Sequence, residues 1–156
     1  MTGPDVRFEP ADPVVPPAAD LLRAMTDELV AMYGSPDGGW ERVLDPTELA
    51  PPRGRYLVGR IDGEIVAGGG VRILEPGIGE VKRMYVVPAR RRRGIAAALL
   101  QALEDEARVM GCTRLRLDTG PKQPHAQRLY LRSGYDPVPD YNDNPKASFW
   151  GEKLLS

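Results

Sequence analysis

The sequence predicts an α/β domain built on a mixed, mostly antiparallel sheet. Two β-rich runs meet at Asp62-Gly63, a pair that tolerates the positive φ angles of a tight hairpin turn. A third β-rich run precedes a long amphipathic helix, and a further strand follows that helix. Because the hairpin comes first and strands lie on both sides of one central helix, a regular βαβ alternation is excluded.

The first third of the chain predicts one short strand, one helix and a long loop. The strand is expected around residues 6–8, and the helix lies between Pro17 and Gly34, residue types that suit helix starts and ends. Its apolar residues at helical spacing are Leu21, Leu22, Met25, Leu29, Met32 and Tyr33. Residues 35–54 are rich in proline and paired glycine, which indicates a loop with one short helical turn. We interpret this loop as a substrate-facing lid.

The rest of the chain predicts the central helix and the elements around it. Residues 79–87 form a strand closed by Pro88, and the helix that follows ends at Gly111. One side of this helix carries Ile95, Leu99, Leu100, Leu103 and Met110. The remaining elements are a strand at 113–119, a short helix within 124–135 and a last strand at 147–155.

The charge distribution predicts a small anionic ligand. Twenty-one basic residues stand against 22 acidic ones in a chain of 156 residues, so the protein lacks the broad basic surface of a duplex-binding protein. The segment from Lys82 to Arg93 nevertheless holds six basic residues and no acidic one. Length and a hydrophobic content of 42% suit a single domain.

The lone cysteine and the amino-terminal sequence predict a soluble protein in the reducing cytoplasm. Cys112 has no second cysteine to pair with, and the first ten residues lack the basic start and apolar stretch of a signal peptide. No apolar run approaches the roughly 18 residues that a membrane span needs. Cys112 is expected in the core, and no metal site is expected, because no histidine and carboxylate set has ligand spacing.

The run of four arginines ends where the central helix begins, at Gly94. Backbone N–H groups at a helix start lack intrahelical partners, and the helix dipole is positive there, so phosphate oxygens bind well. Arginine side chains add charge and bidentate hydrogen bonds. Gly94 allows the main chain to approach a bound phosphate closely, so we expect a diphosphate ligand.

Two segments resemble the GNAT (GCN5-related) N-acetyltransferase family. "RRRGIA" at 91–96 is similar to the family pattern Q/R-x-x-G-x-G/A, and "EVKRMYVVP" looks like the strand that precedes it. "QPHAQRLYLRSGY" at 123–135 is similar to the later helix of the family. The resemblance covers residues 80–135, about a third of the chain. It implies a GNAT fold, with a splayed sheet flanked by helices in a single domain spanning residues 1–156.

The resemblance also implies acetyl-CoA as the cofactor. Its pantetheine arm would lie in a wedge between the strand ending at Val87 and the strand of Leu115 and Leu117, and would pair with main-chain groups of Met84 and Val86. The residues whose amides would hold the pyrophosphate are Arg91, Arg92, Arg93, Gly94, Ile95 and Ala96. Arg90 would face solvent or the 3′-phosphate, and Gln123 stands where the family often has an asparagine that contacts the arm.

Tyr130 and Glu80 are the catalytic residues that the resemblance implies. Tyr130 matches the tyrosine that protonates the coenzyme A sulfur, and the backbone N–H near Val86 would bind the oxyanion. Glu80 stands eleven residues before Arg91, where several members carry a general base that acts on the ammonium through water. A glutamate that only caps a strand beside Lys82 and Arg83 is the open alternative. His125 is expected to be exposed at a helix start rather than catalytic.

The acceptor is expected to enter opposite the cofactor. The aromatic and polar residues of that side are Tyr33, Trp40, Tyr56, Tyr141, Asn142, Asp143, Asn144 and Trp150. Asp140 and Asp143 can attract an ammonium group, which favours a small primary amine over a protein tail, although a plain surface loop explains this segment equally well. The alternatives are a protein N-acetyltransferase, a catalytically silent acyl-CoA-binding module and a nucleic-acid-binding domain. The sequence leaves a homodimer open.

Overall fold

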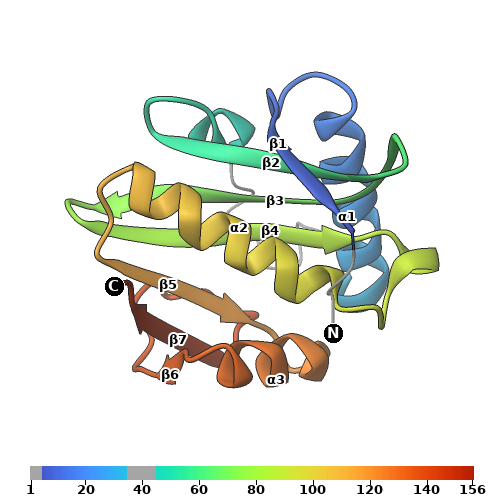
Figure 1. Ribbon diagram of the computed structural model, residues 1–156. Coiled ribbons are helices and arrows are strands. Elements are labelled where there is room, and N and C mark those ends of the chain that lie inside the picture. Colours follow the sequence, from blue (N-terminus) through green and yellow to red (C-terminus); the bar gives the residue numbers. More distant parts are fainter. Residues whose placement is uncertain (1–4, 35–44) are drawn as a thin grey trace.

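The predicted hairpin is present and organises the first half of the sheet (Figure 1). In the computed structural model, which describes residues 5–34 and 45–156, Asp62 and Gly63 join β2 (Gly54–Ile61) to β3 (Glu64–Glu75). Their φ angles are 50° and 82°, as a turn with two left-handed residues requires. The first half of the predicted lid, residues 35–44 with Trp40, lies outside the described residues.

The described strands form one mixed sheet in the order β1-β2-β3-β4-β5-β7-β6. The other strands are β1 (Arg7–Pro10), β4 (Ile78–Val86), β5 (Arg114–Thr119), β6 (Asp136–Pro137) and β7 (Phe149–Leu154). Only β4 and β5 pair in parallel, and every other pair of described neighbours is antiparallel. The expected fold class is confirmed. The two-residue strand β6 was not predicted, because so short a run carries no periodicity.

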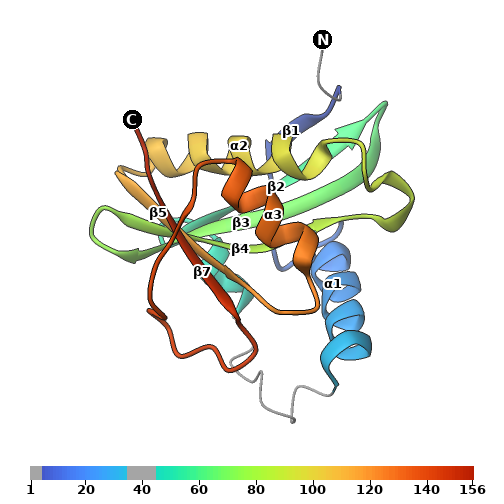
Figure 2. The same cartoon turned by 90° about the horizontal axis from the view of Figure 1, so that it is seen from below.

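Two helices cover opposite faces of this sheet, and a third flanks its edge (Figures 1 and 2). The helices are α1 (Ala18–Tyr33), α2 (Ile95–Val109) and α3 (Pro124–Arg132), with short 3-10 helices η2 (Pro46–Leu49) and η3 (Pro88–Arg90). The alternation of β2 assigns the faces, since Leu57 packs in the cluster with α2 while Tyr56 and Val58 pack in the cluster with α1. The helix predicted between Pro17 and Gly34 is confirmed.

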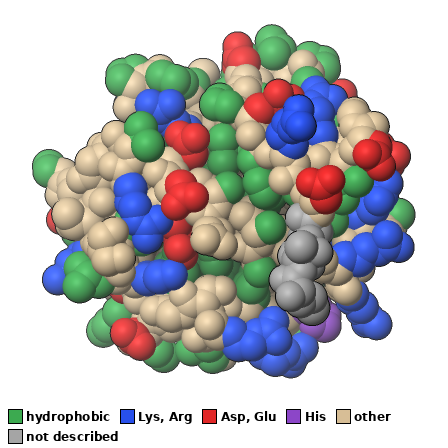
Figure 3. All heavy atoms as spheres, viewed as in Figure 1, with side chains coloured by type: hydrophobic (Ala, Val, Ile, Leu, Met, Phe, Trp, Pro, Cys, Tyr) green, Lys and Arg blue, Asp and Glu red, His purple; other side chains and the backbone are tan. Residues whose placement is uncertain are grey.

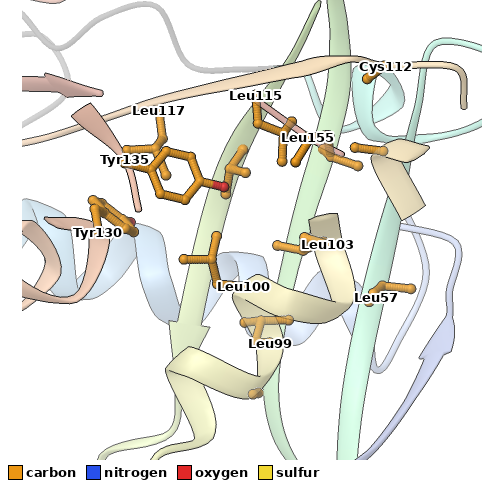
Figure 4. Packing of buried hydrophobic residues seen from close by; sticks show 14 of the residues in the cluster. Leu57, Leu99, Leu100, Leu103, Cys112, Leu115, Leu117, Tyr130, Tyr135 and Leu155 are labelled. Carbon is orange, nitrogen blue, oxygen red and sulfur yellow. The ribbon is translucent and has the colours of Figure 1, made fainter. Parts of the chain in front are cut away.

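The larger core lies between α2 and the sheet (Figure 4). Leu99, Leu100 and Leu103 of α2 are at most 1% exposed, and they pack against strand residues such as Leu115 and Leu117. The helix pattern in the sequence is therefore the core-facing stripe. Cys112 is buried beside this core, as predicted. None of the described helices is long and apolar enough to cross a membrane.

The sheet opens between β4 and β5, as the resemblance implies. The parallel pairing covers three residue pairs, Ile78 with Arg114, Gly79 with Leu115 and Glu80 with Arg116. From Val81 onward β4 continues to Val86 with β3 on one side and none of the described strands on the other. This free edge presents main-chain donors and acceptors to the space between the strands.

Candidate active site

A cavity of about 800 Å³ occupies the wedge between β4 and β5. Its described walls come from α1, the free edge of β4, the start of α2, the end of β5 and α3. We call it the cleft. Figure 3 shows Lys and Arg side chains gathered on one face of the molecule over the loop around η3 and over α3. Five residues of the basic segment predicted from the sequence line the cleft: Lys82, Arg83, Arg90, Arg91 and Arg92.

The first turn of α2 presents free amides to the cleft. Gly94 caps the helix in the left-handed region with φ 81°, and Arg92 before it has φ 66°. The first α-helical bond runs from the Ala98 N–H to the Gly94 carbonyl, so the amides of residues 94–97 have no intrahelical acceptor. Positive φ angles close together also turn successive N–H groups into a concave anion site. Residues 94–97 all line the cleft, so the later half of the range predicted to hold the diphosphate, residues 94–96, presents free amides there. The Arg91 N–H, which belongs to the same predicted range, donates to the Pro88 carbonyl at 3.3 Å.

The side chains of the arginine run have different environments. Arg91 donates from Nε to the Val86 carbonyl at 2.8 Å and pairs with Glu28 of α1, so it joins α1 to β4. Arg90 lines the cleft and pairs with Glu64 at 3.3 Å. Arg92 lines the cleft and is exposed, whereas Arg93 is exposed and is not among the described lining residues. Of the four arginines, Arg92 is best placed to form an ion pair with an anionic ligand in the cleft.

Tyr130 places its phenol at the cleft wall from α3. The residue is 7% exposed, and none of the described residues hydrogen-bonds to its hydroxyl. Its ring packs against Tyr135, with centroids 6.2 Å apart (Figure 4). Burial raises the pKa of Tyr130, and the negative charge of Asp118 raises it further. The hydroxyl therefore stays protonated near neutral pH and is free to donate.

Gln123 and Tyr33 meet at one end of the cleft. Tyr33, the last residue of α1, donates from its hydroxyl to the Gln123 side chain at 3.4 Å and accepts from the Lys122 N–H at 3.1 Å. Gln123 precedes α3 and lines the cleft. These contacts hold the end of α1 against the loop between β5 and α3, although the two segments are far apart in the chain.

Glu80 lies beneath the cleft rather than in its described wall. It is 0% exposed, and its carboxylate accepts from Arg72 at 2.9 Å, from Tyr141 at 2.6 Å and from Asn142 at 3.2 Å. Lys82 adds an ion pair at 3.3 Å. Burial opposes ionisation, yet these cations and donors together hold the pKa of Glu80 below its usual value. The carboxylate is therefore ionised and fully partnered.

Asp118 is the acidic side chain that the described wall of the cleft contains besides Glu28, and the sequence did not single it out. It accepts hydrogen bonds from Asn142 at 2.6 Å and from Asn144 at 3.2 Å, and Lys82 lies 3.7 Å away. In the strand pattern it reads as an ordinary outward-facing residue. The feature that could have identified Asp118 as a cleft residue is its place at the end of β5, where the neighbouring strand β4 diverges.

Several residues expected on the acceptor side meet around these carboxylates. Tyr141 and Asn142 bind Glu80, and Trp150 donates from Nε1 to the Asn142 side chain at 3.0 Å. Asn144 lines the cleft. The segment is thus a folded polar network rather than a plain surface loop.

One expectation about the acceptor side needs correction. Tyr56 is 1% exposed and packs with Ala18 and Leu21 between the sheet and α1, because its position in β2 points it to that face. Asp140 accepts from the backbone amides of Asn142 and Asp143 through one carboxylate oxygen and is not among the described residues that line the cleft, and its attraction for an ammonium group stays a prediction. His125 is exposed beside Arg128, as expected.

The chain matches the Acetyltransferase (GNAT) family over residues 22–135. It is 34% identical over 155 residues to the IAA acetyltransferase of Azospirillum brasilense, covering 97% of this chain and 99% of that one. The solved structure of an acyl-CoA N-acyltransferase from Klebsiella pneumoniae superposes with a TM-score of 0.77 at 32% identity, covering 97% and 99% of the two chains. The protein therefore belongs to the GNAT acetyltransferase family and is an acyltransferase.

The family uses acetyl-CoA as its acyl donor. A GNAT acetyltransferase from Elizabethkingia anophelis, solved with acetyl-CoA bound, has the same fold, with a TM-score of 0.68 at 16% identity over 97% of this chain and 99% of that one. The residues of this chain suit that ligand, because the cleft joins free amides at a helix start to an unpaired strand edge.

Proposed function

We propose that this protein transfers an acetyl group from acetyl-CoA to the primary amine of a small molecule, by direct attack of the amine in a ternary complex. The observation that carries the proposal is the unpartnered hydroxyl of Tyr130, which lines the same cleft as the free amides of α2. A proton donor and an anion site in one cavity are what acetyl transfer from a thioester requires.

The cofactor residues follow from the two walls of the cleft. Amides of residues 94–97, with the Arg92 side chain, would hold the diphosphate, and Gln123 would contact the pantetheine arm. The Val86 carbonyl already accepts from Arg91, while the Val87 N–H donates to Val66 of β3. Since the N–H and C=O of one strand residue point to the same side, the Val86 N–H faces the cleft and is the proposed oxyanion donor. Met84 lies on the same free edge and lines the cleft.

Two side chains of this protein are proposed to act on the reacting groups. Tyr130 donates its proton to the departing thiolate, and Asp118 receives the ammonium of the acceptor at the cleft wall. The role of Glu80 as general base stays a prediction. Its lowered pKa and complete set of partners make it a weak base, so it would act through water and through the network it shares with Asp118.

A broad amine panel with detection of the released thiol tests the proposed function. We expect thiol release that depends on both acetyl-CoA and an amine, and an acetylated small molecule as product. A silent acyl-CoA-binding module would bind the cofactor without releasing thiol. Acetylation of peptides in place of small amines would identify a protein N-acetyltransferase instead. Salt-dependent binding of oligonucleotides without any response to coenzyme A would identify a nucleic-acid-binding domain. A cytoplasmic location and a homodimer stay predictions.

Gly94→Val is expected to weaken coenzyme A binding by about tenfold or more. A β-branched residue is strained at φ 81° by roughly 1–3 kcal/mol, so the loop must rearrange and its amides turn away from the diphosphate. The rise in melting temperature with increasing coenzyme A concentration, compared between wild type and Gly94→Val, measures the loss of affinity. Gly63→Val is the matched control, because it strains a distant hairpin turn at φ 82°. Equal protection of the Gly94 variant and wild type would contradict the assigned diphosphate site.

A further inference from the structure

Arg83 lies at the irregular point of β4, where the strand pairing with β3 shifts register. Between the pairs Gly70 with Lys82 and Gly68 with Tyr85, β4 holds one extra residue, which forms a β-bulge. Arg83 has φ 61°, a left-handed conformation that costs free energy in any residue with a side chain. Such strain at a cavity wall is typical of a side chain held for binding.

The side chain of Arg83 borders two cavities at once. It lines the cleft, and it also lines a second hollow of about 320 Å³ between α1 and η2. The described walls of this hollow are mainly apolar, with Leu22 of α1 and Leu49 of η2 among them. A group bound at Arg83 would therefore reach the cleft from the acceptor side, away from the free amides of α2.

The positive charge of Arg83 is not matched by a bound partner. Among the described residues, no hydrogen bond or ion pair reaches its guanidinium, whereas Lys82 pairs with Glu80 and Arg91 pairs with Glu28. Burial lowers the pKa of Arg83, and the negative charge of Asp118 opposes that change electrostatically without a hydrogen bond or ion pair to Arg83. A half-buried guanidinium without hydrogen-bond acceptors is costly, and a bound anion would remove that cost.

We propose that Arg83 binds an acidic group of the acceptor, so that the substrate is a small molecule carrying both an amine and a carboxylate or phosphonate. This inference rests on the proposed function and names its substrate class. The ammonium lies beside Asp118, and the acidic group lies on Arg83 at the junction of the two cavities. Arg83 thus selects the acceptor and takes no part in proton transfer.

Anion binding tests the role of Arg83 without any need for activity. Saturating coenzyme A occupies the amides of α2, and acetate, propionate and methylphosphonate are then titrated at constant ionic strength while thermal unfolding is followed. We expect at least one of these anions to raise the melting temperature of the wild type and of Arg60→Met, which removes a partly buried arginine paired with Glu9. Arg83→Met is expected to lose that response and keep full protection by coenzyme A. The contrast between carboxylates and methylphosphonate identifies the acidic group.

Matched acceptors supply the kinetic test. β-Alanine is compared with its amide, and 2-aminoethylphosphonate with ethanolamine, in wild type and in Arg83→Met. We expect the anionic member of one pair to be preferred by about 10- to 100-fold in kcat/KM, mainly through KM, and the preference to vanish in the variant. Arg83→Gln provides a second variant if the methionine protein folds poorly.

The outcomes separate this inference from the proposed function. An anion response lost in Arg83→Met would support the acidic-group site even if no amine were acetylated. Equal use of neutral and anionic amines by the wild type, or an unchanged preference in Arg83→Met, would overturn the role of Arg83 while leaving acetyl transfer intact. Loss of coenzyme A protection in Arg83→Met would place Arg83 in the cofactor site instead.

Discussion

Tyr130→Phe is expected to lower kcat by about 10²- to 10⁴-fold while coenzyme A affinity stays unchanged. The phenylalanine ring keeps the packing against Tyr135, because only a hydroxyl without a described partner is removed. What is lost is the proton for the departing thiolate. The raised pKa of the wild-type phenol also predicts that activity shows no decline from Tyr130 ionisation below about pH 10, the usual tyrosine value. Thiol release in single-turnover and steady-state assays measures the change.

Tyr135→Phe is the matched control for this prediction. Tyr135 is 1% exposed, donates to Glu104 at 2.9 Å and is not among the described residues that line the cleft. Its variant is expected to lose about 1 kcal/mol of stability and to retain activity. If Tyr130→Phe stayed within about threefold of wild type at every pH, water or substrate would supply the proton and Tyr130 would only pack.

Glu80→Gln is expected to lower the free energy of unfolding by roughly 3 kcal/mol near neutral pH, because it leaves Arg72 and Lys82 without their buried counter-charge. The folded state lowers the pKa of Glu80 from 4.5, so the stabilisation is fully present above that unfolded value. It is lost as the pH falls through the lower, folded value. The difference between variant and wild type should therefore shrink in acid, and denaturant unfolding at several pH values measures it.

The kinetics of Glu80→Gln separate a base from a positioning residue. A general base gives a deficit that is largest at low pH and recovers as the amine loses its own proton. A residue that only holds Lys82 and Asn142 in place gives a deficit that does not change with pH. Glu75→Gln is the control, since Glu75 is 57% exposed and pairs with Arg116 at 3.6 Å. Its loss of stability is expected to stay below about 1 kcal/mol. Equal stability of Glu80→Gln and wild type at neutral pH would contradict the buried ion-pair network.

Local patterns were enough to predict most of the elements. Each of these features depends on residues close together in the chain: the Asp62-Gly63 turn, the apolar stripe of α2 and the glycine that starts α2. Hydrophobic periodicity and turn chemistry act over a few residues, so they are readable without the fold. The same holds for Tyr130, whose position on α3 follows from the helix pattern and the family resemblance.

The sequence by itself therefore determined most of the strands and helices, the glycine that starts α2 and the presence of Tyr130 on α3. Only the tertiary structure decided which charges are neutralised and which are free. Glu80 is buried because its partners come from β3 and from the segment around residue 142, and Asp118 faces the cleft because β4 and β5 diverge beyond Glu80. Arg83 has no described partner because the bulge in β4 turns it toward two cavities. Such pairings depend on strand register and on contacts between distant segments, which no local pattern contains.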